Sequence, residues 1–187
     1  MPAPRTRITA GTERGRLLKT RPGRSTRPTT SLVREALFNI IGESIRGAQV
    51  LDLFAGAGTL GIEALSRGAE RAIFVDSARA CATIVAENLA ATGFASQGEV
   101  ACADVIDWLS THRLDLSSIN LIVIDPPYHD PILDRVLHTL DRAPLKPQAL
   151  VVAEHHRSDP LPTLTRLRPV QVRDYGTTRL SFLRYGQ

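Results

Sequence analysis

The stretch that decides the fold is Asp52–Gly61, which reads DLFAGAGTLG. Gly56, Gly58 and Gly61 form a GxGxxG pattern between an apolar run and a helical run, where the backbone can approach a ligand closely. The pattern alone is weak, because nicotinamide and flavin proteins share it and because glycines also serve tight turns. It predicts a strand, a loop and a helix at the start of an α/β sheet.

The alternation of strand and helix continues along the chain on both sides of this stretch. Strands are expected at Gln49–Phe54, Ala72–Asp76, Glu99–Ala103, Asn120–Asp125 and Leu150–Glu154, and helices at Leu60–Arg67, Ala78–Thr92, Val105–His112 and Pro131–Arg142. Such alternation predicts a parallel, doubly wound α/β sheet. At the end of the chain, Pro169–Tyr175 and Thr178–Tyr185 are separated by two residues only, which predicts an antiparallel hairpin.

The stretch Leu121–Tyr128, LIVIDPPY, indicates where the chemistry takes place. Its apolar residues are typical of a strand buried on both faces, and the two prolines end that strand rigidly. Asp125 is then left at the carboxyl end of a parallel strand, where open α/β sheets bind ligands. The Asp125 carboxylate and the Pro126 carbonyl can accept the two hydrogens of an exocyclic amine, and the Tyr128 ring can stack on the base. The alternative is a turn aspartate that caps the next helix, with Tyr128 as a packing residue.

Acidic residues end four successive strands and are expected along one edge of the sheet: Asp52, Asp76, Asp104 and Asp125. Asp76 is placed where an acidic side chain can accept both ribose hydroxyls, whereas helix capping is the alternative for Asp76 and Asp104. A pyrophosphate would fit poorly beside Asp52, but a sulfonium cation is tolerated there. The pattern favours an S-adenosylmethionine-dependent methyltransferase, with these candidate cofactor-binding residues: Asp52, Phe54, Gly56, Gly58, Asp76 and Asp104.

Charge is distributed unevenly along the 187 residues. The first 30 residues have a net charge of +7, whereas the remainder has a net charge of −3. A basic arm on a mildly acidic body indicates a polyanionic partner, and a solvated or disordered tail is the alternative. Within the arm, Arg7–Ala10 and Arg16–Lys19 flank Gly11–Gly15 and predict a small β-hairpin. We assign residues 1–26 to this arm and residues 27–187 to the methyltransferase domain.

A helix is expected after the arm, with a threonine of Arg27-Pro28-Thr29-Thr30 as its N-cap. Apolar residues recur at helical spacing and define the face expected to be buried: Val33, Ala36, Leu37, Ile40 and Ile41. Arg34 and Asn39 fall outside this stripe. They face either solvent or a ligand pocket, and the spacing does not decide between the two.

Composition narrows the class of protein further. The hydrophobic fraction of 43% and the charged fraction of 22% are those of a soluble globular protein, and no apolar run approaches the ~20 residues of a membrane span. Cys81 and Cys102 form no CxxC pair and are expected to be reduced thiols in the core. His155 and His156 are adjacent in a strand and face opposite ways, so no metal site is expected. We expect a cytoplasmic monomer without a membrane partner.

The ordered set of motifs resembles a known family. Arg27-Pro-Thr-Thr, Val33–Asn39, LDLFAGAGTLGIEALSRGA, DPPY and Tyr175–Leu180 are similar to the RsmD-like 16S ribosomal RNA guanine-N2 methyltransferases. The resemblance implies a Rossmann-like seven-stranded sheet that ends in the antiparallel hairpin. It also implies methylation of the exocyclic N2 amine of a guanine in small-subunit ribosomal RNA, which is either naked or part of an assembling 30S particle. Many relatives carry Glu in place of Asp76.

The candidate residues are assigned to the following roles. Asp125, Pro126 and Tyr128 are the candidate catalytic residues, and Arg27, Arg34 and Tyr128 are the candidate substrate contacts. Two other functions stay open. One is a methyltransferase for adenine N6 or cytosine N4 in DNA or RNA, because DPPY suits any amino group of a base. The other is a catalytically idle RNA-binding factor for ribosome assembly that keeps the fold.

Overall fold

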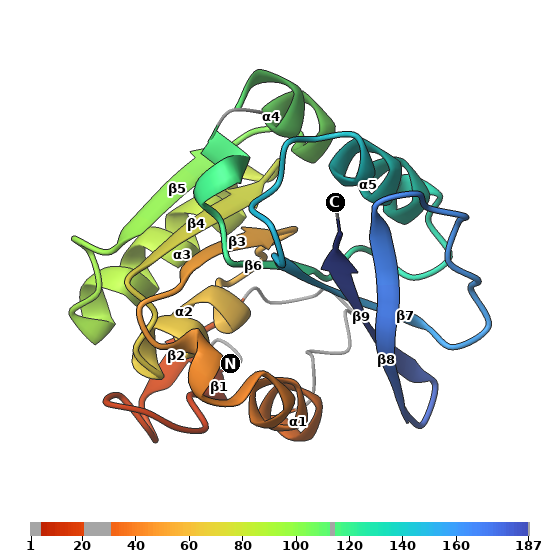
Figure 1. The fold of residues 1–187 in the computed structure, drawn as a ribbon. Helices are drawn as coiled ribbons and strands as arrows, with labels where there is room; N and C mark the ends of the chain where they lie inside the picture. Colours follow the sequence, from red (N-terminus) through yellow and green to blue (C-terminus); the bar gives the residue numbers. More distant parts are fainter. Residues whose placement is uncertain (1–4, 21–30, 113–114, 187) are drawn as a thin grey trace.

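A seven-stranded sheet forms the centre of the computed structural model, which describes residues 5–20, 31–112 and 115–186 (Figure 1). The spatial order of its strands is β5-β4-β3-β6-β7-β9-β8. The strands are β3 (Gln49–Leu53), β4 (Arg71–Asp76), β5 (Gly98–Cys102), β6 (Leu121–Ile124), β7 (Leu150–His156), β8 (Leu167–Tyr175) and β9 (Thr178–Tyr185). Strands β3 to β7 pair in parallel, whereas β9 pairs antiparallel with both β7 and β8. The predicted α/β class, parallel sheet and terminal hairpin are confirmed.

Helices cover both faces of the sheet (Figure 1). They are α1 (Ser31–Ile41), α2 (Thr59–Ser66), α3 (Arg79–Thr92), α4 (Val105–Thr111) and α5 (Ile132–Asp141), with short 3-10 helices η1 (Gly42–Ile45) and η2 (Asp115–Ser118). Along β3 and β4, Val50 and Phe74 pack with the core under α1, α2 and α3, whereas Leu51 and Val75 pack with the core under α4 and α5. Because both faces are covered, the parallel strands consist mainly of apolar residues.

The buried face of α1 differs from the predicted stripe. Val33, Leu37 and Ile41 are buried as expected, but Arg34 and Phe38 are buried as well. The expectation that Arg34 lies outside the buried face is therefore wrong, whereas Asn39 is exposed. The physical reason is that the N-terminal hairpin covers this side of α1, which a helical stripe considered by itself does not reveal.

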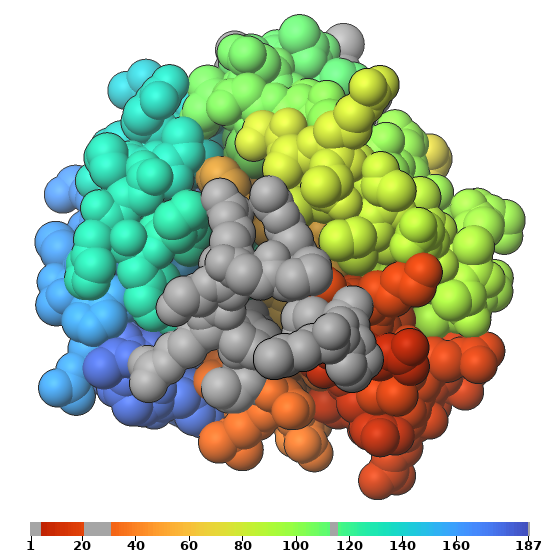
Figure 2. Space-filling model, turned by 180° about the vertical axis from the view of Figure 1, so that it is seen from behind, coloured from red at the N-terminus to blue at the C-terminus, as the bar shows by residue number. Residues whose placement is uncertain are grey.

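The described part of the basic arm is an ordered hairpin. Strands β1 (Arg5–Arg7) and β2 (Leu17–Lys19) pair antiparallel, with the first strand beginning two residues earlier than predicted. Ile8 and Leu18 are each only 1% exposed and belong to the core under α1, α2 and α3. The hairpin lies beside α3 on the surface of the molecule (Figure 2). Residues 5–20 are thus not a solvated tail.

The two cysteines, both expected in the core, differ in their exposure to solvent. Cys81 is buried as expected, but Cys102 is exposed, because it ends β5 at the edge of the sheet, which corrects its assignment to the core. Among the described helices, none combines the length and the apolar character that crossing a membrane requires. The boundary assigned between residues 26 and 27 lies outside the described residues.

Candidate active site

Two loops meet at the carboxyl edge of the sheet, where the strand order reverses. Strand β3 lies between β4 and β6, so successive connections leave it in opposite directions, and ligands of open α/β sheets bind at such a position. The glycine loop, Phe54–Gly58, follows β3, and Asp125–Tyr128 follows β6. The Asp125 N–H donates to the Leu53 carbonyl at 3.4 Å. The two predicted motifs are therefore brought together.

The backbone of the glycine loop is left-handed at three positions. The φ angles are 64° at Phe54, 58° at Gly56 and 75° at Gly58. Glycine adopts this region without penalty, but for phenylalanine it is uncommon and marks a constrained loop. A Cβ atom at Gly58 would lie 3.2–3.3 Å from side chains of α3 and β4, and one at Gly61 would overlap the Phe74 ring. The GxGxxG glycines thus shape the loop and allow α2 to pack closely on the sheet.

Two of the predicted aspartates hold the glycine loop in place. The Asp76 carboxylate accepts hydrogen bonds from Gly56 N at 2.9 Å and from Ala78 N at 2.8 Å. The Asp52 carboxylate accepts a hydrogen bond from Gly61 N at 2.8 Å. Asp52 is 1% exposed, so it supports the start of α2 from within the core. The pKa of Asp52 is raised to about 7, chiefly by burial and also by the charges of Asp125 and Asp76, while the hydrogen bond from Gly61 opposes the shift.

Asp104 lies at the end of β5, at the outer end of this acidic edge. Its carboxylate caps α4 by accepting hydrogen bonds from Ile106 N at 2.8 Å and from Asp107 N at 3.2 Å. Its side chain is otherwise exposed. Asp104 thus acts as a helix cap in this structure, which was the alternative considered for it. A contact between Asp104 and the cofactor stays a prediction.

The DPPY motif leaves β6 in a partly buried turn. Pro126 is buried, Pro127 is exposed, and Asp125 and Tyr128 are half-buried. The Tyr128 hydroxyl donates to Glu154 Oε1 at 3.1 Å and shares a 2.7 Å hydrogen bond with Thr178 Oγ1. Burial raises the pKa of Tyr128 to about 12, so the hydroxyl keeps its proton at neutral pH.

Glu154 and Thr178 are residues that the sequence analysis did not assign to the site. Glu154 is on β7 and Thr178 begins β9, so the terminal hairpin helps to hold Tyr128. Thr178 lies within Tyr175–Leu180, which the sequence analysis quoted for the family resemblance alone. The family motif therefore drew attention to Thr178. It did not identify Tyr128 as the hydrogen-bond partner of Thr178, because the two residues are 50 positions apart in the sequence.

Of the two arginines proposed as substrate contacts, Arg27 lies outside the described residues and Arg34 is 1% exposed. Arg34 Nε donates to Glu63 Oε2 at 3.2 Å, and its Nη2 donates to the Arg7 carbonyl at 2.6 Å. Burial lowers the pKa of the Arg34 guanidinium, which the Glu63 carboxylate opposes. The expectation that Arg34 contacts the substrate is therefore corrected. Its guanidinium is buried and forms hydrogen bonds that link α1 to α2 and to the N-terminal hairpin.

Comparison with known proteins agrees with this arrangement. The family model described as Conserved hypothetical protein 95 matches residues 6–184. The chain belongs to this family. Ribosomal RNA small subunit methyltransferase D of Escherichia coli is 36% identical over 159 residues, which are 84% of this chain and 78% of that protein. YlbH of Bacillus subtilis is 39% identical over 174 residues, which are 92% and 95% of the two chains.

A solved structure of a similar protein has the same fold. The yhhF protein of Escherichia coli superposes with a TM-score of 0.84 at 31% identity, covering 98% of this chain and 99% of that chain. Family membership confirms the resemblance to RsmD-like methyltransferases. The matched residues 6–184 include all but the first residue of the N-terminal hairpin and all but the last residue of the terminal hairpin, so both belong to what the family shares.

A cluster of histidines lies beside the DPPY motif. His129, His156 and Asp159 each offer one ligand atom, and these atoms lie within 4.8 Å of one another. His129 Nδ1 and Asp159 Oδ1 are 2.8 Å apart, and His129 N donates to Asp159 Oδ2 at 3.1 Å. Sequence spacing did not indicate this cluster, because His129 follows the DPPY motif whereas His156 and Asp159 lie at and after the end of β7. The carboxylate holds His129 at its left-handed φ of 60° directly after the motif.

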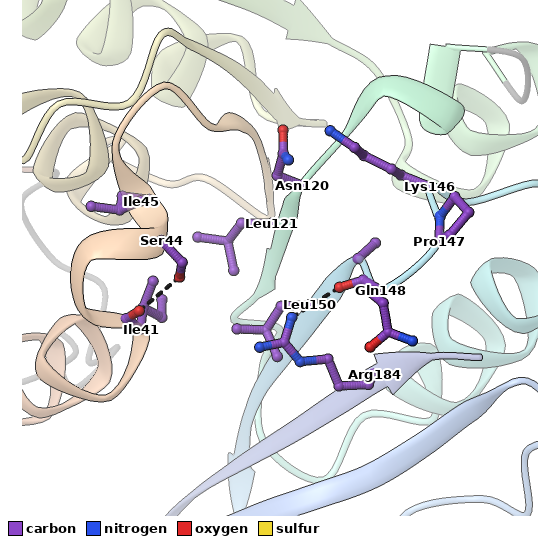
Figure 3. A pocket seen from close by; sticks show the side chains of 11 residues that line it. Ile41, Ser44, Ile45, Asn120, Leu121, Lys146, Pro147, Gln148, Leu150 and Arg184 are labelled. Carbon is purple, nitrogen blue, oxygen red and sulfur yellow. Dashed lines mark hydrogen bonds between the residues drawn. The ribbon is translucent and has the colours of Figure 1, made fainter.

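A separate cavity of about 170 Å³ lies at the other end of the parallel strands, where their amino ends are (Figure 3). Asn120 and Leu150 line it near the amino ends of β6 and β7, together with Arg184 of β9. Arg184 Nη1 donates to the Gln148 carbonyl at 2.9 Å across its wall. Because the glycine loop and DPPY follow the carboxyl ends of the strands, this cavity is not part of the candidate active site.

Proposed function

We propose that this protein transfers a methyl group from S-adenosylmethionine to the exocyclic N2 amine of a guanine in small-subunit (16S) ribosomal RNA. The observation that carries the proposal is the position of Asp125–Tyr128 directly beside the glycine loop at the point where the strand order reverses. The name of the Escherichia coli relative supports ribosomal RNA as the substrate. We further propose that the protein acts as a cytoplasmic monomer.

The residues at the β3 and β4 ends suit S-adenosylmethionine. The Asp76 carboxylate uses one acceptor position on each oxygen for Gly56 and Ala78, and each oxygen has a further lone pair for a ribose hydroxyl. The left-handed loop at Phe54, Gly56 and Gly58 presents backbone to a bound ligand. Asp52 contributes through the loop that it holds, and Asp104 is our candidate at the outer end of the edge.

The residues after β6 suit the methylation of an amine. The amine of guanine is a poor nucleophile because its lone pair is delocalised into the ring. Asp125 accepts one of its hydrogens and the Pro126 carbonyl accepts the other, which favours a pyramidal nitrogen and stabilises the positive charge that develops on it. S-adenosylmethionine supplies the electrophilic methyl group, and its sulfur departs as a neutral thioether. The surplus proton leaves the nitrogen for Asp125 or water.

Tyr128 is assigned to the base that enters this pocket. A base in a folded RNA has to leave its stack before its amine reaches Asp125, and an aromatic ring can replace the lost stacking neighbour. The hydrogen bonds from the Tyr128 hydroxyl to Glu154 and Thr178 limit rotation of that ring. Tyr128 therefore serves as a positioned stacking surface, not as a proton donor in the reaction.

The basic hairpin is assigned to the phosphate backbone of the RNA. Its exposed cationic residues are Arg5, Arg7, Arg14, Arg16 and Lys19. Arginine forms planar, two-point hydrogen bonds to phosphate, and such contacts position a nucleic acid without reading its sequence. Arg27 follows the hairpin in the sequence and stays a proposed substrate contact.

The test is the identity of the methylated nucleoside. The protein and labelled S-adenosylmethionine are incubated separately with deproteinised small-subunit RNA, with small ribosomal subunits and with DNA, and the digested products are identified by mass spectrometry. We expect label in N2-methylguanine from RNA or subunits, and a strongly reduced rate of labelling in the Asp125→Ala variant. Label in N6-methyladenine, in N4-methylcytosine or in DNA alone would contradict the guanine assignment. Binding of RNA without any methyl transfer would instead indicate a catalytically idle factor for ribosome assembly.

A further inference from the structure

The side chain of Asn88 joins two segments that are far apart in the sequence. Asn88 is on α3 and is 2% exposed. Its Oδ1 accepts a hydrogen bond from Lys19 N at 2.9 Å, and its Nδ2 donates to the Lys19 carbonyl at 3.0 Å. The same Nδ2 donates to the Ala57 carbonyl at 2.9 Å. One buried amide thus connects the end of the basic hairpin with the middle of the glycine loop.

The three partners determine how this amide is oriented. Rotation by 180° would place the NH₂ group against the Lys19 N–H and the amide oxygen against the carbonyls of Lys19 and Ala57. Leaving a buried polar group unpaired costs more free energy than one hydrogen bond contributes. The three hydrogen bonds of the Asn88 amide to Lys19 and Ala57 are therefore retained together. A displacement of Lys19 therefore acts on Ala57, and the reverse is also true.

The glycine loop has little freedom to absorb such a displacement. Ala57 lies between Gly56, whose N–H is held by Asp76, and Gly58, which packs against α3 and β4. The carbonyl of Ala57 is held by Asn88. These contacts come from different elements, so the loop is held against both α3 and β4 at three successive residues.

The other end of the hairpin is fixed to α2, which begins directly after the loop. The Glu63 carboxylate accepts hydrogen bonds from Thr9 N at 2.9 Å, from Thr9 Oγ1 at 2.6 Å and from Ala10 N at 3.0 Å. Ser66 Oγ donates to the Ala10 carbonyl at 2.7 Å. The hairpin is therefore attached to the elements on both sides of the glycine loop, which agrees with its place against the body of the molecule (Figure 2).

We propose that Asn88 is a positioning residue that couples the basic hairpin to the glycine loop, so that RNA on the hairpin and cofactor at the loop strengthen each other's binding. The proposal rests on the proposed function, since it takes the loop as the cofactor site and the hairpin as an RNA contact. By reciprocity, each ligand changes the affinity of the other by the same factor.

The first experiment needs no RNA. Hydrogen exchange of the full chain is measured with and without S-adenosylhomocysteine, which binds without turnover. Peptides that cover residues 8–19 should exchange about five-fold or more slowly when the ligand is bound, a factor at the lower end of usual coupling. Residues 167–172 of the edge strand β8, away from the turn that contacts Tyr128, serve as the internal reference. Slower exchange confined to residues 54–61, with the N-terminal hairpin unchanged, would overturn the proposal.

Two neighbouring variants then test whether Asn88 carries the coupling. Asn88→Asp has the same shape and still accepts from Lys19 N, but it cannot donate to Ala57 or to the Lys19 carbonyl. Glu87→Gln is the matched control, because it removes only the exposed ion pair with Lys19 Nζ. Asn88→Asp should abolish the response of the N-terminal hairpin and Glu87→Gln should keep it. An unchanged response in Asn88→Asp would overturn the assignment, and the wild-type measurement stands should that variant fail to fold.

The second experiment measures the reciprocal effect. The affinity for S-adenosylhomocysteine is determined with and without deproteinised small-subunit ribosomal RNA, and we expect RNA to increase it about five-fold or more in wild type but less than two-fold in Asn88→Asp. RNA that binds without changing the affinity of the wild type would overturn the coupling. Failure of both this RNA and small ribosomal subunits to bind would instead contradict the proposed function, while the exchange measurement still decides whether the N-terminal hairpin and the glycine loop are coupled.

Discussion

The two sides of the candidate site hold their loops by different means. On the side of β3 and β4, three of the groups that fix the glycine loop and the hairpin are almost fully buried, with Asp52 1%, Asn88 2% and Glu63 0% exposed, whereas Asp76 is half-buried. On the side of β6 and β7, the turn residues Tyr128 and His129 are half-buried and exposed. Buried polar groups are costly to leave unpaired, so we expect changes to these three groups to lower the stability of the fold, whereas a change at the half-buried Asp125 should lower it less.

The largest effect on the free energy of unfolding is expected where the buried ion pairs of Glu63 are broken. Glu63→Gln removes the charge that compensates Arg34 and Arg67, whose Nε atoms lie 3.2 Å and 2.9 Å from its oxygens. Loss of one partner in a buried ion pair typically costs about 3–5 kcal/mol. Denaturant unfolding should show this loss. Glu99→Gln, which breaks an exposed pair with Arg71, should cost less than about 1 kcal/mol, and equal losses would remove the contrast between buried and exposed pairs.

The substrate side should show the opposite behaviour. Asp125→Ala is expected to lower the methyl-transfer rate by about 10²–10³, because the charge that develops on the amine loses its acceptor. The free energy of unfolding and the affinity for S-adenosylmethionine should be nearly unchanged. Asp134→Ala, an exposed carboxylate on α5, is the matched control and should leave the rate at its wild-type value. A wild-type rate in Asp125→Ala would exclude the catalytic role.

A change at the cofactor edge should appear in binding. Asp76→Ala loses the proposed ribose contacts and the hydrogen bond to Gly56, and hydrogen bonds to a charged acceptor are worth about 1.5–3 kcal/mol. Calorimetry with S-adenosylmethionine measures the loss. Asp107→Ala, an exposed carboxylate at the start of α4, should bind as wild type does. Unchanged affinity in Asp76→Ala would mean that the ribose binds elsewhere.

The cofactor side should also respond to pH through Asp52. Its pKa in the folded protein is raised from 3.8 to about 7, so the folded state binds a proton more tightly than the unfolded state does. This contribution to stability is fully present below about pH 4 and is lost as the pH rises to about 7, by at most about 1.4 kcal/mol per pH unit. Unfolding curves of wild type and Asp52→Asn should therefore diverge across that window. Parallel profiles would argue against a protonated Asp52.

The smallest effect on the folded protein is expected at the exposed arginines of the hairpin. Arg5→Gln with Arg14→Gln should leave stability and cofactor affinity unchanged, because both side chains are exposed. Each lost phosphate contact should reduce the slope of log affinity against log salt by about 0.7–0.9. Titration of small-subunit RNA at several salt concentrations measures this slope. An unchanged slope would show that the hairpin does not contact phosphate.

Sequence alone determined the fold class and the two central motifs. The periods of the apolar residues, the glycine pattern of Asp52–Gly61 and the prolines after Asp125 are local signals, since backbone geometry and burial restrict the residues at each position. The parallel strands, their helices and the terminal hairpin were therefore predicted to within a few residues. The resemblance to the family, carried by the order of these motifs, was confirmed.

Tertiary structure alone decided which polar side chains meet. Arg34 was expected to contact substrate, but its partner Glu63 is 29 residues away, and Asn88 lies 69 residues from Lys19. Likewise, Thr178 reaches Tyr128 across 50 residues, and His129 meets Asp159 across 30. No local period encodes these pairs, because each depends on how the hairpins and helices pack on the sheet. A hydrogen bond requires positions accurate to a fraction of an ångström, and only the folded chain determines such positions.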